Sequence, residues 1–85
     1  MNGRVKRNLK SMAKVRPIDL KIGKKGLTKN FLEEANKILS KDGMIKLSHT
    51  FQRNEKDDII SKIELLLSVQ LIEKVGKTLT FYKIL

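Results

Sequence analysis

The stretch from residue 18 to residue 28 constrains the fold more than any other part of this 85-residue chain. Residues 18–22 alternate apolar with polar side chains, which is the pattern of a half-buried strand. Gly-Lys-Lys-Gly follows at residues 23–26, and glycines at both ends favour a tight turn. Thr28 is then a favourable N-cap for a helix. The stretch therefore predicts a strand, a glycine-bounded turn and a helix, which together form one unit of an α/β fold.

The rest of the chain also alternates between helical and strand-like patterns. The predicted helices cover residues 4–15, 28–41 and 54 to about 69, and the predicted strands cover residues 18–22, 44–51, 70–75 and 78–84. Pro17 is expected to end the first helix and Gly43 the second, while Asn54 is the predicted N-cap of the third. Gly76-Lys77, with glycine first, predicts a type II′ hairpin turn.

These patterns also predict which side chains face the core. They are Val5, Leu9, Met12, Ala13, Ile18, Leu20, Ile22, Phe31, Leu32, Ala35, Ile38, Leu39, Ile45, Leu47, His49, Phe51, Ile59, Ile60, Ile63, Leu66, Leu67, Leu79, Phe81 and Leu85. The element order α-β-α-β-α-β-β predicts a single compact domain over residues 1–85, of the α/β (α+β) class, with a four-stranded sheet.

Positive charge is concentrated in the first third of the chain. The formal net charge is +10, and residues 1–29 hold ten basic side chains against Asp19 alone. Residues 30–85 hold nine basic and eight acidic side chains. A domain this basic, with the excess in one segment, is typical of a protein that binds a polyanion, and nucleic acid is the class we favour over an anionic membrane.

Several kinds of chemistry find no support in the residues. The chain has no cysteine and a single histidine, His49, so neither a thiolate or histidine-rich metal site nor a Ser/His/Asp or Cys/His catalytic set can be assembled. Glu55, Asp57 and Asp58 are better interpreted as first-turn helix charges than as metal ligands. We therefore expect no enzyme activity, cofactor, metal or small-molecule substrate. The lack of cysteine and of a long apolar run leads us to expect a cytoplasmic protein without a membrane span.

The glycine-bounded turn is the strongest candidate for a binding site. Glycine lacks Cβ, so a bulky partner can approach the backbone at Gly23 and Gly26. The helix expected after Thr28 would add unpaired N–H groups and the positive end of its dipole, and Lys24 and Lys25 would add ammonium groups. We interpret the turn as a phosphate-binding surface. The alternative, that both glycines serve only the turn, stays open.

Three segments together resemble a known family, the CRM (chloroplast RNA splicing and ribosome maturation) domain of YhbY-like proteins. They are Ile22-Gly23-Lys24-Lys25-Gly26-Leu27-Thr28, Ile45-Lys46-Leu47, and Val75-Gly76-Lys77-Thr78-Leu79 with Tyr82 and Lys83. The resemblance covers about Val5 to Lys83. It implies an RNA-binding module with a mixed four-stranded sheet, similar to the C-terminal domain of translation initiation factor three. It also implies a role on precursors of the large ribosomal subunit.

The resemblance places the GxxG loop of the family at Gly23–Gly26. Combined with the charge pattern, it predicts that RNA, expected to be large-subunit ribosomal RNA or its precursor, contacts two groups of residues. They are Gly23, Lys24, Lys25, Gly26, Thr28 and Lys29 at the turn, and Arg7, Lys10, Lys14, Arg16 and Lys21 in the basic segment before it. Binding to a ribosomal protein is an additional open possibility. A winged-helix DNA-binding regulator, with residues 70–84 as the wing, is the alternative function.

Overall fold

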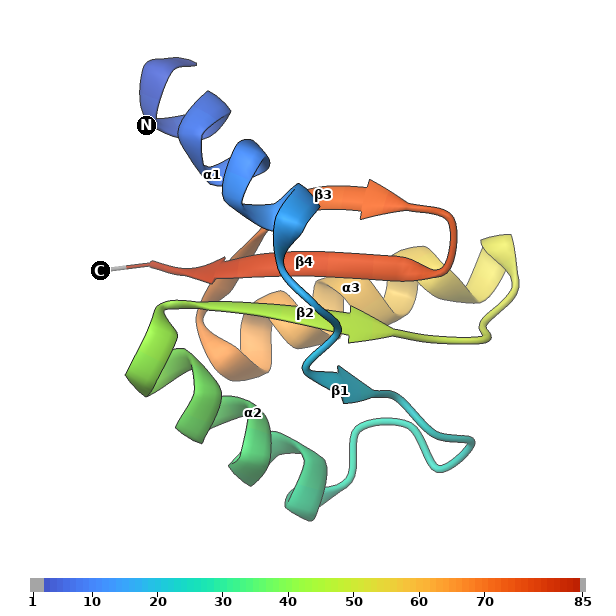
Figure 1. Cartoon of the computed structure of the whole chain (residues 1–85). Coiled ribbons are helices and arrows are strands. Elements are labelled where there is room, and N and C mark those ends of the chain that lie inside the picture. Colours follow the sequence, from blue (N-terminus) through green and yellow to red (C-terminus); the bar gives the residue numbers. More distant parts are fainter. Residues whose placement is uncertain (1–2, 85) are drawn as a thin grey trace.

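The computed structural model describes residues 3–84 and confirms the predicted element order and the four-stranded mixed sheet (Figure 1). The elements are α1 (Gly3–Val15), β1 (Leu20–Lys21), α2 (Lys29–Asp42), β2 (Met44–Ser48), α3 (Arg53–Leu67), β3 (Val69–Val75) and β4 (Thr78–Lys83). No helix within residues 3–84 is long and apolar enough to cross a membrane.

The strand order in the sheet is β1-β2-β4-β3. β1 pairs with β2 in parallel, so the chain needs a crossover between them, and α2 provides it. β4 pairs antiparallel with β2 on one side and with β3 on the other. The turn at residues 23–26 lies between β1 and α2, which places it at the end of the edge strand β1 (Figure 1).

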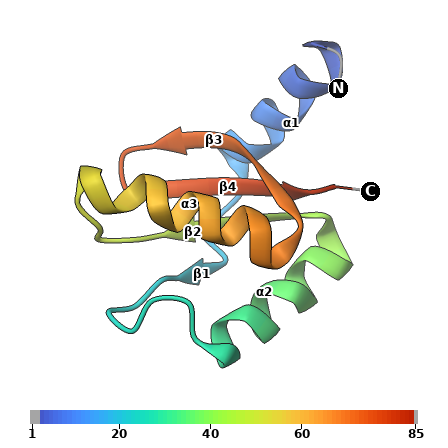
Figure 2. The same ribbon diagram turned by 180° about the vertical axis from the view of Figure 1, so that it is seen from behind.

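The sheet is the middle of three layers. α2 and α3 cover one face, and α1 crosses the other (Figures 1 and 2). The main core lies between the sheet and the pair α2–α3, and its buried residues are Ile22, Phe31, Ala35, Leu39, Ile45, Leu47, Ile60, Ile63, Leu67, Val69, Leu79 and Phe81. A smaller cluster beneath α1 contains Ala13, Met44 and Ile72. The face of α1 opposite the sheet is therefore uncovered.

The prediction that Met12 faces the core was wrong. Its side chain is 54 % exposed, whereas Ala13 is fully buried and Leu9 packs against Ala13's cluster. α1 meets the sheet along a narrow line defined by Leu9 and Ala13, four residues apart, and Met12 is turned about 100° away from Ala13 on the helix. The side chain of Val5 lies outside the described part of the structure.

The predicted strand at residues 18–22 is shorter than expected. Regular strand geometry is limited to Leu20–Lys21, although Asp19 N–H donates to the Lys46 carbonyl and Ile22 N–H to the Ser48 carbonyl, both at 2.8 Å. Ile18 is 53 % exposed and not in the core. The reason is topological, because residues 16–19 carry the chain from α1 on one face to the sheet edge, and Ile18 lies on that connection.

Both ends of α3 differ from the prediction. The helix begins at Arg53, and its N-cap is Gln52, whose carbonyl accepts the N–H groups of Glu55 and Lys56 at 3.0 Å. Asn54 is therefore inside the first turn rather than at the cap. The helix ends at Leu67, because Ser68 takes the left-handed conformation with φ 53° and the next residue already starts β3.

The prediction that Leu66 faces the core was also wrong. Leu66, on α3, is 54 % exposed because α3 contacts the sheet through Ile60, Ile63 and Leu67, which lie on an adjoining side of the helix. Leu85 lies outside the described residues.

The boundaries of the other helices and strands agree with the prediction to within three residues. Gly43 closes α2 with φ 74°, and Gly76 takes φ 55° as the first residue of the hairpin turn.

Candidate nucleic-acid interface

The turn between β1 and α2 is a hydrogen-bonded and exposed loop. Gly26 N–H donates to the Gly23 carbonyl at 3.0 Å, which closes a four-residue turn with Lys24 and Lys25 at its tip. Both lysine side chains are exposed. Gly26 has φ 74°, a conformation that side chains with a Cβ rarely adopt. The two ammonium groups are therefore carried on a loop whose shape depends on Gly26.

Gly23 differs from Gly26 in its backbone conformation. Its φ lies outside the left-handed region, and an added Cβ would meet no heavy atom within 4 Å. The free fold therefore does not require glycine at this position, either for backbone conformation or for packing. A partner that approaches the loop backbone from outside would supply such a requirement.

The N-terminus of α2 lies directly behind the loop. Thr28 has extended backbone geometry, and its Oγ1 accepts the Phe31 N–H at 3.1 Å, as expected for an N-cap. The N–H groups of Lys29 and Asn30 belong to the first turn and have no acceptor within the helix. Phe31 is buried in the core, so this end of the helix is anchored, while Lys29 and Asn30 in its first turn are exposed. The loop and helix end together can donate to an anion.

Arg16 differs from the other predicted RNA-binding residues because protein carboxylates engage it. Its Nε donates to Asp19 Oδ2 at 2.8 Å, and its Nη2 donates to Asp42 Oδ2 at 2.7 Å. The hydrogen bond to Asp19 is the main cause that raises the pKa of Arg16, and Arg16 in turn lowers the pKa of Asp42. Asp19 Oδ2 also accepts the Lys46 N–H at 2.8 Å. Arg16 thus joins the end of α1 to α2 and to the edge of β2.

The remaining predicted residues fall into two groups rather than one surface. Lys21 and Lys29 are exposed on either side of the loop, whereas Lys10 and Lys14 are exposed on α1. Figures 1 and 2 place α1 and the loop at opposite ends of the molecule, so the basic residues that are close in sequence are separated in space. The side chain of Arg7 lies outside the described part of the structure.

Sequence reasoning missed a basic residue between these two groups. Lys46 lies on β2, on the sheet face that α1 crosses, and it shares a cavity with Lys14. The signal was present, because Lys46 alternates with the core residues Ile45 and Leu47 and must point to the other face. What the sequence did not reveal is that α1 leaves this part of the face open.

The aromatic side chains of His49 and Tyr82 are held by contacts within the protein. His49 is 2 % exposed and stacks on Phe51 with 5.7 Å between ring centroids, which agrees with the packing role predicted for it. Tyr82 donates its hydroxyl to Gln70 at 2.7 Å and packs against the cluster beneath α1. In the described residues, no three His, Cys, Asp or Glu side chains gather as a metal site would require.

The fold and loop define a small three-layer α+β domain that presents a lysine-bearing GxxG loop at the start of a helix. The comparisons with known proteins agree with this class. The model of the CRS1/YhbY (CRM) domain family matches residues 1–83, and the chain belongs to that family. The winged-helix alternative is therefore wrong at the level of the fold, since β1 and β2 form a parallel pair joined through α2.

The fold is also found among solved structures. An example is the solution structure of a Staphylococcus aureus protein that is described as a candidate RNA-binding protein. The two structures superpose with a TM-score of 0.80, covering 100 % of this chain and 90 % of the other at 22 % sequence identity. No curated protein sequence matches the chain.

Proposed function

We propose that the protein binds RNA by holding backbone phosphates at the Gly23–Gly26 loop. The observation that carries the proposal is the combination found there: two exposed lysines, a glycine at position 23 that the free fold does not need, and a helix N-terminus behind them. Such contacts position a protein on nucleic acid without reading its sequence. The family membership and the description of the Staphylococcus aureus neighbour support RNA as the ligand.

We further propose that the RNA is large-subunit ribosomal RNA or its precursor and that the protein acts in the cytoplasm without catalysing a reaction. The support is the resemblance of about Val5 to Lys83 to the CRM domain of YhbY-like proteins, and the match of residues 1–83 to the family model. Sedimentation of a cell lysate, with detection of the protein across the gradient at low salt, tests the ribosomal part. Co-migration with large-subunit precursors is expected, and recovery only at the top of the gradient contradicts it.

RNA is a better candidate than duplex DNA because α3, the recognition helix that a winged-helix regulator would use, is not suited to the major groove. α3 carries Glu55, Asp57 and Asp58 near its start, and these carboxylates would be repelled by groove phosphates. Tight binding of duplex DNA at the same salt concentration as RNA would contradict this part of the proposal.

The loop is tested by reversing its charge. Lys24→Asp with Lys25→Asp keeps both glycines, so we expect little change in melting temperature and a large loss of RNA affinity. The matched control is Lys37→Asp with Lys62→Asp, an equal charge change at two exposed positions on α2 and α3. RNA affinity should fall much less in the control. If the loop and control variants lose affinity equally, the effect is one of net charge and the loop has no special role.

Salt dependence gives a second, quantitative measurement on the same loop. Lys24→Ala with Lys25→Ala should lower the magnitude of the slope of log K against log salt by roughly 1.4–1.8, because each phosphate that a lysine no longer neutralises reduces it by about 0.7–0.9. An unchanged slope would mean that neither lysine contacts a phosphate.

The basic residues of α1 are proposed as a separate contact. Replacing Arg7, Lys10 and Lys14 together by Gln should weaken RNA binding and flatten the salt dependence. Because the loop and α1 lie far apart, the effect of this variant should be larger on a long RNA that reaches both than on one short enough to occupy the loop alone. Equal affinity at two ionic strengths would identify α1 as a merely solvated basic helix.

A further inference from the structure

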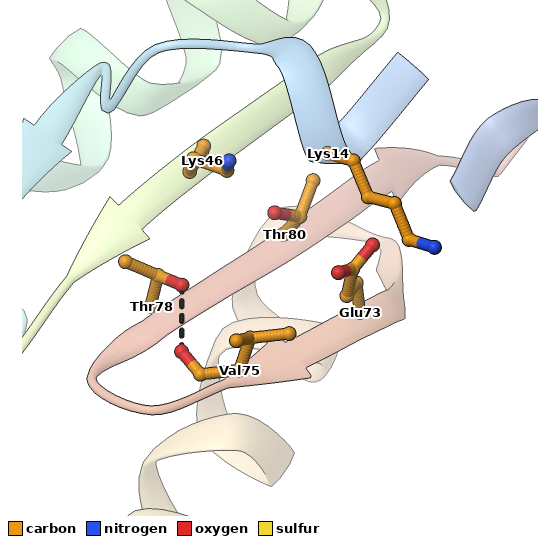
Figure 3. Close-up of a pocket in the computed structure, with 6 residues that line it drawn as sticks. All are labelled: Lys14, Lys46, Glu73, Val75, Thr78 and Thr80. Atoms are coloured by element: carbon orange, nitrogen blue, oxygen red, sulfur yellow. Dashed lines mark hydrogen bonds between the residues drawn. The ribbon is translucent and has the colours of Figure 1, made fainter. Parts of the chain in front are cut away.

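α1 leaves part of its sheet face uncovered, and a cavity of about 420 Å³ lies there (Figure 3). The residues that line it are Lys14, Lys46, Glu73, Val75, Thr78 and Thr80. Thr80 is 2 % exposed, and Val75 is 56 % exposed beside it on the hairpin. The cavity is thus an open depression with a polar floor, an apolar edge and two lysines, and its volume falls within the range of small-molecule binding sites.

A β-bulge places a carboxylate in this cavity. The register between β3 and β4 shifts between Leu71 and Glu73, so that Glu73 pairs with Thr80. In a regular strand Ile72 and Glu73 would point to opposite faces. Here Ile72 packs in the cluster beneath α1 and Glu73 lines the cavity on the same face. Bulges of this kind re-aim side chains and are common near functional sites.

The carboxylate of Glu73 is incompletely satisfied by the protein. Its Oε2 is buried and accepts no hydrogen bond from any described residue. Figure 3 shows the carboxylate between Thr80 and Lys14, yet Lys14 forms no ion pair with it in the described part of the chain. A buried acceptor without a donor costs free energy, so a ligand that supplies N–H groups at this point is favoured.

The charges around the cavity restrict what that ligand can be. A metal ion or an arginine side chain would satisfy Glu73 but would be repelled by Lys14 and Lys46. A simple anion would satisfy the lysines but would be repelled by Glu73. A nucleotide carries negative phosphates and N–H donors in one molecule, and its base could lie against the exposed apolar surface of Val75. We propose that the cavity is a subsite for one nucleotide of the bound RNA, with the base directed at Glu73.

The chemistry of the carboxylate also selects among the bases. An ionised carboxylate only accepts hydrogen bonds, and it has two oxygens side by side. Guanine presents two adjacent donors, N1–H and the N2 amino group. The amino groups of cytosine and adenine stand next to a ring nitrogen acceptor, and the single N–H of uracil stands between two carbonyls. Because the terminal torsion of a glutamate side chain is soft, both oxygens of Glu73 can turn toward the ligand. Guanine is therefore the base that the subsite prefers.

This inference rests on the proposed RNA binding, and one experiment separates the two. Oligouridines carrying a single central guanosine, inosine, adenosine, cytidine or uridine are compared by fluorescence anisotropy. Inosine matters most, because it differs from guanosine only by the missing N2 amino group. The guanosine oligomer should bind at least about five-fold more tightly than each of the others. Equal binding of all five overturns the subsite and leaves RNA binding intact, whereas no binding of any oligomer overturns both.

Protein variants locate the preference within the structure. Glu73→Gln should abolish the preference for guanosine over inosine. Affinity for the all-uridine oligomer should be retained, because the substitution takes away a negative charge that in the parent protein repels phosphates. Glu55→Gln removes one charge from the layer on the other side of the sheet and should keep the preference. A Glu73→Gln protein that melts as the parent does and still prefers guanosine refutes the assignment.

Chemical-shift mapping needs no variant. Titration of the parent with guanosine monophosphate should shift the amide signals of Glu73, Thr78 and Thr80, and inosine monophosphate should shift them less at equal concentration. Shifts confined to the Gly23–Gly26 loop would show that mononucleotides bind as phosphates alone and would overturn the subsite.

Discussion

The two carboxylates that hold Arg16 should contribute very differently to stability. Asp19 is 16 % exposed and accepts three hydrogen bonds, two from Arg16 at 2.8 and 3.1 Å and one from the Lys46 N–H at 2.8 Å. Asp42 is 38 % exposed and accepts only the bond from Arg16 at 2.7 Å. The same guanidinium is thus hydrogen-bonded to one carboxylate that is mostly buried and to another that is more exposed.

The expected magnitudes follow from burial. Asp19→Ala removes charge-assisted bonds and leaves the Lys46 N–H without its side-chain acceptor, so we expect a loss of about 2–4 kcal/mol in the free energy of unfolding. For a domain of this size that corresponds to roughly 8–32 °C in melting temperature, at about 4–8 °C per kcal/mol. Asp42→Ala removes an ion pair that water already screens, so it should change the melting temperature far less than Asp19→Ala does.

Thermal and urea unfolding followed by circular dichroism measures both variants, with Asp42→Ala as the matched control. Asp19 also fixes the entry of the chain into β1, so Asp19→Ala should loosen the loop that follows and broaden its amide signals. If the two variants lose equal stability, burial does not decide the strength of these hydrogen bonds, and the reasoning from exposure is refuted.

The remaining predictions concern one histidine and two glycines. Burial, reinforced by Lys56 and Lys77, lowers the pKa of His49 below its ordinary 6.5. The unfolded chain therefore takes up a proton below about pH 6.5 that the folded chain does not, so the free energy of unfolding should fall from pH 7 to pH 5. His49→Phe should make this fall shallower in melting experiments. An identical pH profile in the variant would contradict the reasoning. Gly23→Ala should leave the melting temperature unchanged or slightly higher and still weaken RNA binding, since only a ligand meets the added methyl group. Gly26→Ala should lower stability by about 1 kcal/mol because of its φ of 74°. Unaltered RNA affinity in a folded Gly23→Ala protein would show that no ligand approaches the loop backbone closely.

Local patterns were sufficient to predict the elements and the loop. The N-cap at Thr28 and the closing glycine at position 43 depend on interactions within a few residues, and both were confirmed by the structure, whereas the alternation before Gly23 predicted a strand that is regular only at Leu20–Lys21. The faces of β2 and β4 were also predictable, because side chains in a strand alternate strictly. The N-cap of α3 was not, because Asn54 and Gln52 are both polar and the tertiary position of the preceding strand decides where the helix begins.

The sequence by itself determined that this is a basic α/β domain with a GxxG loop between a strand and a helix. The tertiary structure alone decided how the basic residues are distributed. It separated Lys10 and Lys14 from the loop by placing α1 on the other face of the sheet, and it paired Arg16 with Asp42, which is 26 residues away in the chain. It also brought Glu73 beside Lys14 through a bulge. These relations depend on contacts between distant segments, which no local periodicity encodes.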